Sequence, residues 1–122
     1  ALLDIADAPG LLRHPKVGAS WEGFALEQVI GRLRAEPQEC YHWRLQSGPE
    51  LDLLVVRGGR RRGFEFKLTD APAVTPSMLA AQQALGLERL QVIHAGARSF
   101  PMAKGIEAVA LRRLQEDVEP LD

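Results

Sequence analysis

The stretch that most constrains the fold is residues 50–67, in which two apolar runs flank a pair of glycines. The runs are Leu51–Val56 and Phe64–Leu68, and the glycine pair lies at 58–59 within an arginine cluster. Glycine tolerates the positive φ angles that tight hairpin turns require. The stretch therefore predicts two antiparallel strands joined by a short turn.

Charged residues interrupt both apolar runs of this hairpin. Asp52 lies in the first run, and Glu65 and Lys67 lie in the second. Side chains alternate along a strand, so Glu65 and Lys67 are expected on one face. Burying ionisable groups in a sheet is unfavourable unless each finds a partner, a metal or water, so the three residues suggest a site. The alternative is structural: an ion pair between Glu65 and Lys67 on an edge strand, and an ordinary acid near a turn at Asp52.

Composition limits the class of protein. The chain has 122 residues, of which 46% are hydrophobic, so we expect one domain over residues 1–122. Fifteen basic and sixteen acidic residues give a net charge of −1, which provides no bulk electrostatic case for nucleic acid binding. Cys40 is the single cysteine, which excludes an internal disulfide and a cysteine-based zinc site and favours a reducing cytoplasm.

No run approaches the roughly 18 apolar residues that span a bilayer, so we expect no membrane partner. The chain starts abruptly in an apolar run, with residues 1–18 forming a lead-in, and we expect a fragment of a longer protein. A natural N-terminus from which a tag was trimmed is the alternative.

Local patterns place the remaining elements. Ser20 is a suitable N-cap for an amphipathic helix that ends near Arg34, and Gly86 is a suitable stop for a second helix. The expected elements, in chain order, are a helix at 20–34, strands at 40–45, 50–56 and 62–68, a helix at 76–85, strands at 89–95 and 105–111, and a short polar helix.

This order has three strands in an antiparallel meander and a helical crossover to a parallel fourth strand. The predicted fold class is α/β (α+β) with a mixed central sheet. The order is that of the α-β-β-β-α-β core of the restriction-endonuclease-like fold, with an extra C-terminal strand.

Within this order the charged residues resemble the PD-(D/E)XK nuclease signature. Asp52 lies on the second strand, Glu65-Phe66-Lys67 lies on the third, and Glu22 matches the carboxylate that often accompanies the signature in the first helix. Leu51 stands where the signature has proline, a position at which proline is often replaced. Without the resemblance, Glu22 is explained by the favourable placement of a carboxylate in the first turn of a helix.

Several short sequence segments resemble one family more closely, and the resemblance extends over roughly residues 11–111. The matching segments are His-Pro-Lys-Val-Gly-Ala-Ser-Trp-Glu-Gly-Phe at 14–24, Trp-Arg at 43–44, Gly-Pro-Glu-Leu-Asp at 48–52 and Phe-Glu-Phe-Lys at 64–67. They are similar to the C-terminal domain that follows an AAA+ ATPase module in many prokaryotic proteins. The resemblance implies an N-terminal ATPase module as a partner in the same chain.

The resemblance also implies a chemistry. Asp52 and Glu65 would hold Mg²⁺ or Mn²⁺, and Lys67 would position or help deprotonate a bound water during phosphodiester hydrolysis. Further ligand candidates are the Phe66 carbonyl and the carboxylates of Glu22 and Glu50. The implied function is a Mg-dependent nuclease acting on DNA. The alternative is a catalytically silent nuclease-fold module that binds nucleic acid or a protein and regulates the attached ATPase.

Other candidates are weaker. Arg60, Arg61 and Arg62 lie at the hairpin tip and could contact phosphates, or they could simply solubilise a turn. Trp21 and Trp43 could fill the core or stack on bases. No Walker motif is present, so we expect no ATP site in this chain.

Overall fold

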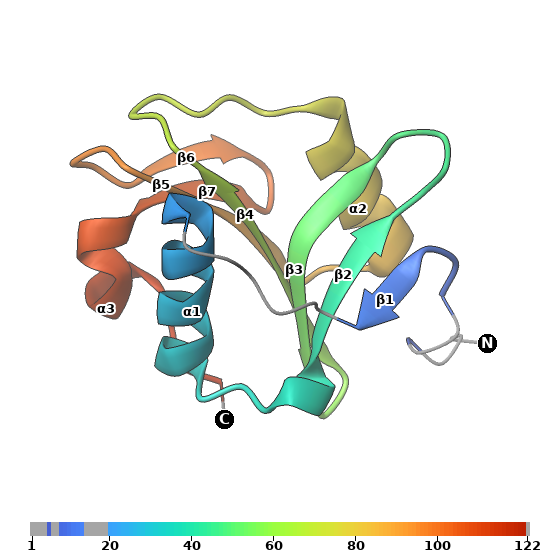
Figure 1. Cartoon of the computed structure of the whole chain (residues 1–122). Coiled ribbons are helices and arrows are strands. Elements are labelled where there is room, and N and C mark those ends of the chain that lie inside the picture. The colour runs from blue at the N-terminus through green and yellow to red at the C-terminus, as the bar shows by residue number, and fades with distance from the viewer. Residues whose placement is uncertain (1–4, 6–7, 14–19, 122) are drawn as a thin grey trace.

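The fold is a mixed α/β sandwich, seen here in a computed structural model that describes residues 5, 8–13 and 20–121. Figure 1 shows the arrangement of the elements. These are β1 (Leu11–Arg13), α1 (Trp21–Leu33), η2 (Pro37–Glu39), β2 (Cys40–Arg44), β3 (Glu50–Arg57), β4 (Arg60–Lys67), α2 (Pro76–Leu85), β5 (Arg89–His94), β6 (Phe100–Ala103), β7 (Ile106–Ala110), η3 (Leu111–Arg113) and α3 (Leu114–Asp117).

In the described residues the strands form one seven-stranded sheet in the order β1-β2-β3-β4-β5-β7-β6. Neighbours from β1 to β4 are antiparallel, β4 and β5 are parallel, and β5 and β7 are parallel. The predicted meander and the parallel pairing through the α2 crossover are therefore confirmed. β4 lies between β3 and β5, so it is not the edge strand of the structural alternative, although its pairing with β3 ends before Glu65 and Lys67.

The sequence analysis did not predict two of the strands, β1 and β6. β1 lies within the segment interpreted as a lead-in, and β6 lies between the two last predicted strands and pairs antiparallel with β7. Each has at most four residues, so neither has enough alternation to be recognised in a sequence.

Local chemistry fixes both long helices at the predicted ends. The Ser20 hydroxyl accepts a hydrogen bond from the Gly23 N–H at 3.0 Å, and the Thr75 hydroxyl accepts one from the Met78 N–H at 3.2 Å. Gly86 follows α2 with a φ of 58°, the left-handed conformation that glycine adopts without strain. The predicted helix boundaries are confirmed.

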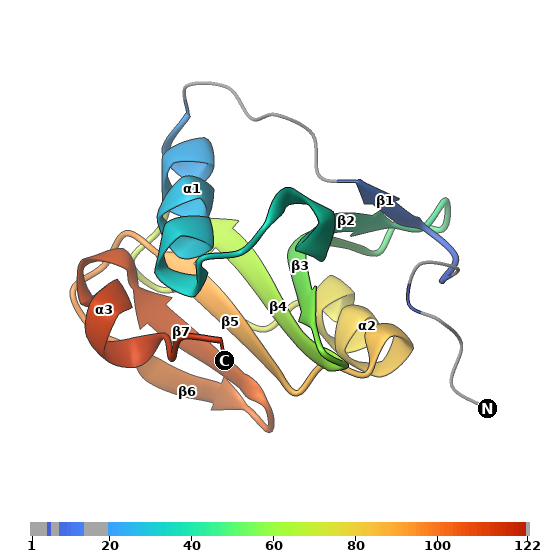
Figure 2. The same ribbon diagram turned by 90° about the horizontal axis from the view of Figure 1, so that it is seen from below.

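Helices cover the sheet on both faces, as the two views in Figures 1 and 2 show. The buried residues of α1 and α3 belong to one apolar cluster, which includes Leu53, Phe64 and Phe66 of the central strands. The buried residues of α2 belong to a second cluster, which includes Leu51 and Leu54. The sheet separates the two clusters.

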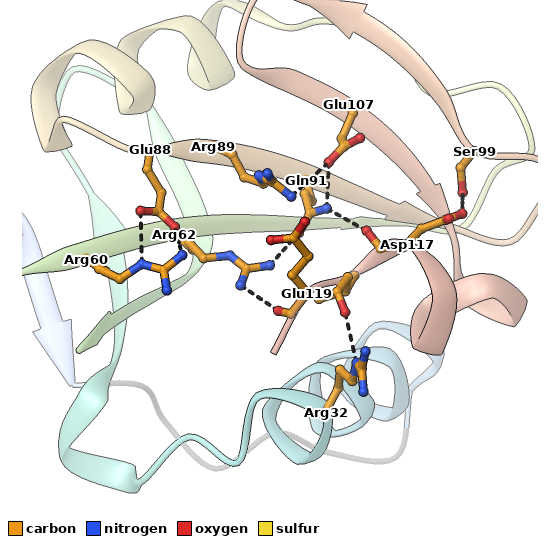
Figure 3. Close-up of polar contacts among 11 residues, drawn as sticks. Arg32, Arg60, Arg62, Glu88, Arg89, Gln91, Ser99, Glu107, Asp117 and Glu119 are labelled. Carbon is orange, nitrogen blue, oxygen red and sulfur yellow. Dashed lines mark hydrogen bonds and ion pairs between the residues drawn. The ribbon is translucent and has the colours of Figure 1, made fainter. Parts of the chain in front are cut away.

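Side-chain donors hold the C-terminal segment across the α1 face (Figure 3). Arg62 is 1% exposed and donates to the Glu119 carbonyl at 2.6 Å and to the Gln91 side-chain oxygen at 3.1 Å. Arg32, on α1, donates to the Val118 carbonyl at 2.9 Å. The buried guanidinium of Arg62 thus binds a segment 57 residues further along the chain through its terminal nitrogens, while its Nε has no hydrogen-bond partner among the described residues.

We predict that Arg62→Ala lowers the free energy of unfolding by about 3 kcal/mol, because it leaves the Glu119 carbonyl and the Gln91 side chain without their buried donor. Urea denaturation measures this change. Arg112→Ala, at an exposed arginine of η3, is the control and should stay within about 0.5 kcal/mol of the wild type. An Arg62→Ala change no larger than the control's would contradict the stabilising role of this buried contact.

Candidate functional site

The site lies where β3 and β4 separate. Their pairing ends with Leu53 opposite Phe64, although both strands continue beyond this point. β3 continues beside β2 as far as Glu50, and β4 continues beside β5 as far as Lys67, which lies opposite His94. Figure 1 shows the two strands diverging from their common turn. The sheet therefore forms a fork, with backbone groups at its inner edges that no longer pair with each other.

A change of register between β2 and β3 occurs at the same place. Tyr41 pairs with Leu54 and Trp43 pairs with Leu51, so His42 faces two residues of β3, Asp52 and Leu53. An extra residue of this kind is a β-bulge, and it changes the direction of the side chains that follow. Leu51 accordingly packs on the α2 side together with Leu54, which strict alternation would not allow.

In the fork, the side chains of Asp52 and Glu65 accept hydrogen bonds from backbone amides that have no backbone partner on the opposite strand. Asp52 Oδ2 accepts a hydrogen bond from the Phe66 N–H at 3.0 Å, and Glu65 Oε2 accepts one from the Asp52 N–H at 3.1 Å. Each acid thus binds a backbone amide of the opposite strand. This exchange holds the two acids side by side.

Glu65 is buried, with 4% of its surface exposed. Burial raises the pKa of its carboxyl group to about 9, a shift reinforced by the hydrogen bond and the negative charge of the Asp52 side chain. The positive charge of Lys67 acts in the opposite direction. At neutral pH Glu65 therefore keeps its proton.

A pocket of about 280 Å³ opens beside Asp52. Its walls come from the first turns of α1 and from the fork, and the lining residues are Ser20, Glu22, Gly23, Leu26, Asp52, Phe66 and Lys67. The N-terminus of a helix carries partial positive charge, and the Lys67 ammonium carries a full one. The pocket therefore combines a carboxylate for a cation with two positive features for an anion.

The structure brings four predicted residues to this place. Asp52 and Glu65 are in contact, and Lys67 and the exposed Glu22 line the same pocket as Asp52. Among the described residues, however, no three His, Cys, Asp or Glu side chains lie close enough together to hold a metal. Glu50 lies outside the pocket lining and forms an ion pair with Arg44 at 3.0 Å.

The arginines of the hairpin tip lie at the other end of β4 from Lys67. Arg60 forms an ion pair with Glu88 at 2.8 Å, Arg61 donates to the Leu85 carbonyl at 3.1 Å, and Arg62 is buried. All three contact other parts of the chain. Gly58 and Gly59 have φ angles of 55° and 83°, which confirms the tight turn.

His94 is a feature near the site that the sequence did not single out as functional. It is fully buried opposite Lys67, and its Nδ1 accepts a hydrogen bond from the Gly96 N–H at 3.0 Å. The Ala95 N–H donates to the Thr69 carbonyl at 2.9 Å, which ties the end of β5 to the segment after Lys67. The ring thus helps to fix the exit of β4, and only the parallel register reveals this.

Comparison with known proteins shows similarity to a family and to longer relatives. Residues 17–114 match a family described as a domain of unknown function (DUF4143). Uncharacterised proteins of Mycobacterium bovis and Mycobacterium tuberculosis are each 45% identical over 108 residues, which cover 88% of this chain and 24% of the relative. The chain thus spans about a quarter of the length of these relatives. No solved structure matches the chain.

None of the helices in the described part of the chain has the length and apolarity needed to cross a membrane.

We predict that Glu65→Gln stabilises the metal-free protein at alkaline pH. The folded-state pKa of Glu65 is raised from 4.5 to about 9, so its stabilising contribution is complete below pH 4.5 and is lost as the pH rises toward 9. Glutamine accepts the same backbone hydrogen bond without titrating. Its advantage should grow by up to about 1.4 kcal/mol per pH unit within this window.

Thermal denaturation of both proteins between pH 5 and 9 measures this difference. Glu50→Gln is the matched control, since Glu50 is a partly exposed acid on the same strand as Asp52. A difference between wild type and Glu65→Gln that does not change with pH would show that Glu65 is not protonated in the fold.

Proposed function

The chain belongs to the DUF4143 family, and we propose that it is a metal-dependent nuclease-like domain that hydrolyses phosphodiester bonds in DNA. The observation that carries the proposal is the fork, where Asp52 and Glu65 converge beside a pocket that also contains Lys67. The observed order of a helix, three antiparallel strands, a helix and a parallel strand supports a restriction-endonuclease-like fold. The motif Glu65-Phe66-Lys67 on β4 supports the PD-(D/E)XK interpretation.

The residues at the fork fit a small, hard cation. Mg²⁺ is commonly bound by one or two carboxylates, with water and substrate phosphates completing its six ligands. Asp52 and Glu65 supply two adjacent carboxyl groups, and a divalent cation can take the place of the proton that Glu65 carries. Glu22, on the pocket wall, would reach the cation through water. Mn²⁺ would satisfy the same oxygen ligands.

A bound cation would supply Lewis acidity to the phosphate and lower the pKa of a water molecule. Lys67 would hold its ammonium group against the phosphate oxygens and neutralise the charge that develops there. The N-terminus of α1 would favour the same anionic group. A water oxygen would form the new bond to phosphorus, the bond to the leaving sugar oxygen would break, and protons would exchange with solvent.

The length of the relatives supports a larger assembly. Because this chain corresponds to about a quarter of each, the proposal includes a longer polypeptide in which an N-terminal AAA+ ATPase module drives or controls the domain. A cytoplasmic location belongs to the same proposal.

A catalytically silent module is the second candidate, and two observations favour it. The two fork carboxylates already satisfy backbone amides, so they have a structural task without metal. The hairpin arginines bind other parts of the chain, which leaves the tip with little to offer a phosphate backbone. In this case the domain would bind nucleic acid or a protein and regulate the attached ATPase.

We predict that the wild type binds Mn²⁺ or Mg²⁺ and cleaves DNA in its presence. Asp52→Asn should abolish metal binding, because it removes one of two carboxylates. Lys67→Ala should retain metal binding and reduce cleavage by about 10²–10⁴-fold, the usual contribution of a positioned acid–base or charge-stabilising group. Calorimetry gives the metal affinity, and cleavage of plasmid and single-stranded DNA gives the rate.

Glu50→Gln is again the control and should leave both measurements unchanged. Absence of metal binding and of cleavage by the wild type would overturn the enzymatic proposal. DNA binding without cleavage in saturating metal would instead support the silent module.

Metal affinity should also rise with pH. The Glu65 proton must leave when a cation binds, and its pKa of about 9 makes that release unfavourable at neutral pH. Calorimetry of the same titration in buffers of different ionisation enthalpy counts the protons released. Release of no proton at pH 7 would contradict the interpretation that Glu65 is protonated in the metal-free fold.

A further inference from the structure

Residues 71–87 contain no aspartate, glutamate, lysine or arginine, in a chain of which 25% of the residues are charged. This uncharged segment comprises most of the loop after β4, the whole of α2 and the turn that follows. A helix that faces solvent normally carries charged residues on its outer face. The composition of the segment is therefore unlike that of an ordinary surface helix.

The outer face of α2 is exposed nevertheless. Met78, Ala81 and Leu85 are buried against the sheet, whereas Leu79 is 51% exposed and Ala84 is exposed. Ala80 and Ala84 lie four residues apart, so their side chains share one stripe of the helix. Small residues at this spacing allow a second helix to approach closely.

The exposed residues of α1 provide a comparison for the solvent-facing side of a helix in this chain. The exposed positions of α1 include Glu22, Glu27 and Gln28 beside the apolar Phe24, and the exposed Arg34 caps its C-terminus. The two helices cover opposite faces of the same sheet, and only α1 carries charge on its outer side. The absence of charged residues indicates that the outer face of α2 contacts another surface rather than solvent.

The remainder of a longer polypeptide is the occupant that the observations favour. The relatives have about four times the length of the matched region, so a large part of each lies outside this domain. Ile5 and Ala8 pack against the apolar cluster beneath α2, together with Val74 and Ala80. Ile5 and Ala8 therefore lie on the side of the sheet that carries α2.

We propose that this chain is part of a longer polypeptide and that the outer face of α2 (Leu79, Gln83 and Ala84) docks against an apolar, uncharged helix face in the remainder of that polypeptide. The pocket beside Asp52 lies at the N-terminus of α1, on the other face of the sheet. Docking on α2 would therefore leave the pocket open. This inference does not depend on the proposed nuclease function.

Cysteine labelling tests the proposal without disturbing the core. Ala84→Cys places a thiol on the outer face of α2, and Gln28→Cys places one on the exposed face of α1. The native Cys40 is buried. The rate of maleimide labelling is measured by mass spectrometry of the peptide that carries each site, in the 122-residue chain and in the longer polypeptide.

We expect both thiols to react at similar rates in the 122-residue chain. In the longer polypeptide, Ala84→Cys should react at least about tenfold more slowly, whereas Gln28→Cys should keep its rate. Equal rates for Ala84→Cys in both proteins would overturn the proposal. Slow labelling in the 122-residue chain that depends on its concentration would also overturn it, by identifying a second copy of the domain as the occupant.

Discussion

The exchange of hydrogen bonds between Asp52 and Glu65 across the fork is the interaction on which the site depends. Separation of β3 and β4 removes the backbone partners of the Asp52 and Phe66 amides, and a buried amide without a partner costs about 1–3 kcal/mol. The two carboxyl groups satisfy these amides. As a consequence the protein buries Glu65 beside the half-buried Asp52, and it stabilises this arrangement by keeping the proton of Glu65.

This arrangement is informative because simpler solutions exist. Asparagine and glutamine accept the same backbone hydrogen bonds without a charge to bury, so satisfying the amides does not require acids. An acid pair in this position lowers the stability of the metal-free fold at neutral and alkaline pH. Residues that reduce stability in this way are typical of functional sites, and this supports a metal ligand role over a purely structural one.

Local patterns in the sequence were sufficient for the long elements, because caps such as Ser20 and Thr75 act within a few residues of themselves. The identities of the acids at the fork could also be predicted from the interrupted apolar runs. Features set by pairing between distant segments could not be predicted. The β-bulge at Asp52 depends on the register with β2, and the burial of Arg62 depends on a carbonyl 57 residues away. From the sequence, an arginine close to a glycine turn is expected at the surface, and only the folded structure shows that the C-terminal segment covers Arg62.

The bulge also connects the two faces of the molecule. Leu51 and Leu54 pack under α2, and Asp52 lies between them on the same strand. A displacement of α2 would therefore reach the acid pair through β3, by way of close-packed side chains. A nuclease controlled by an attached module and a silent domain that reports to one would both need such a connection. The strand that forms one arm of the fork is thus also a physical link between α2 and the residues of the pocket.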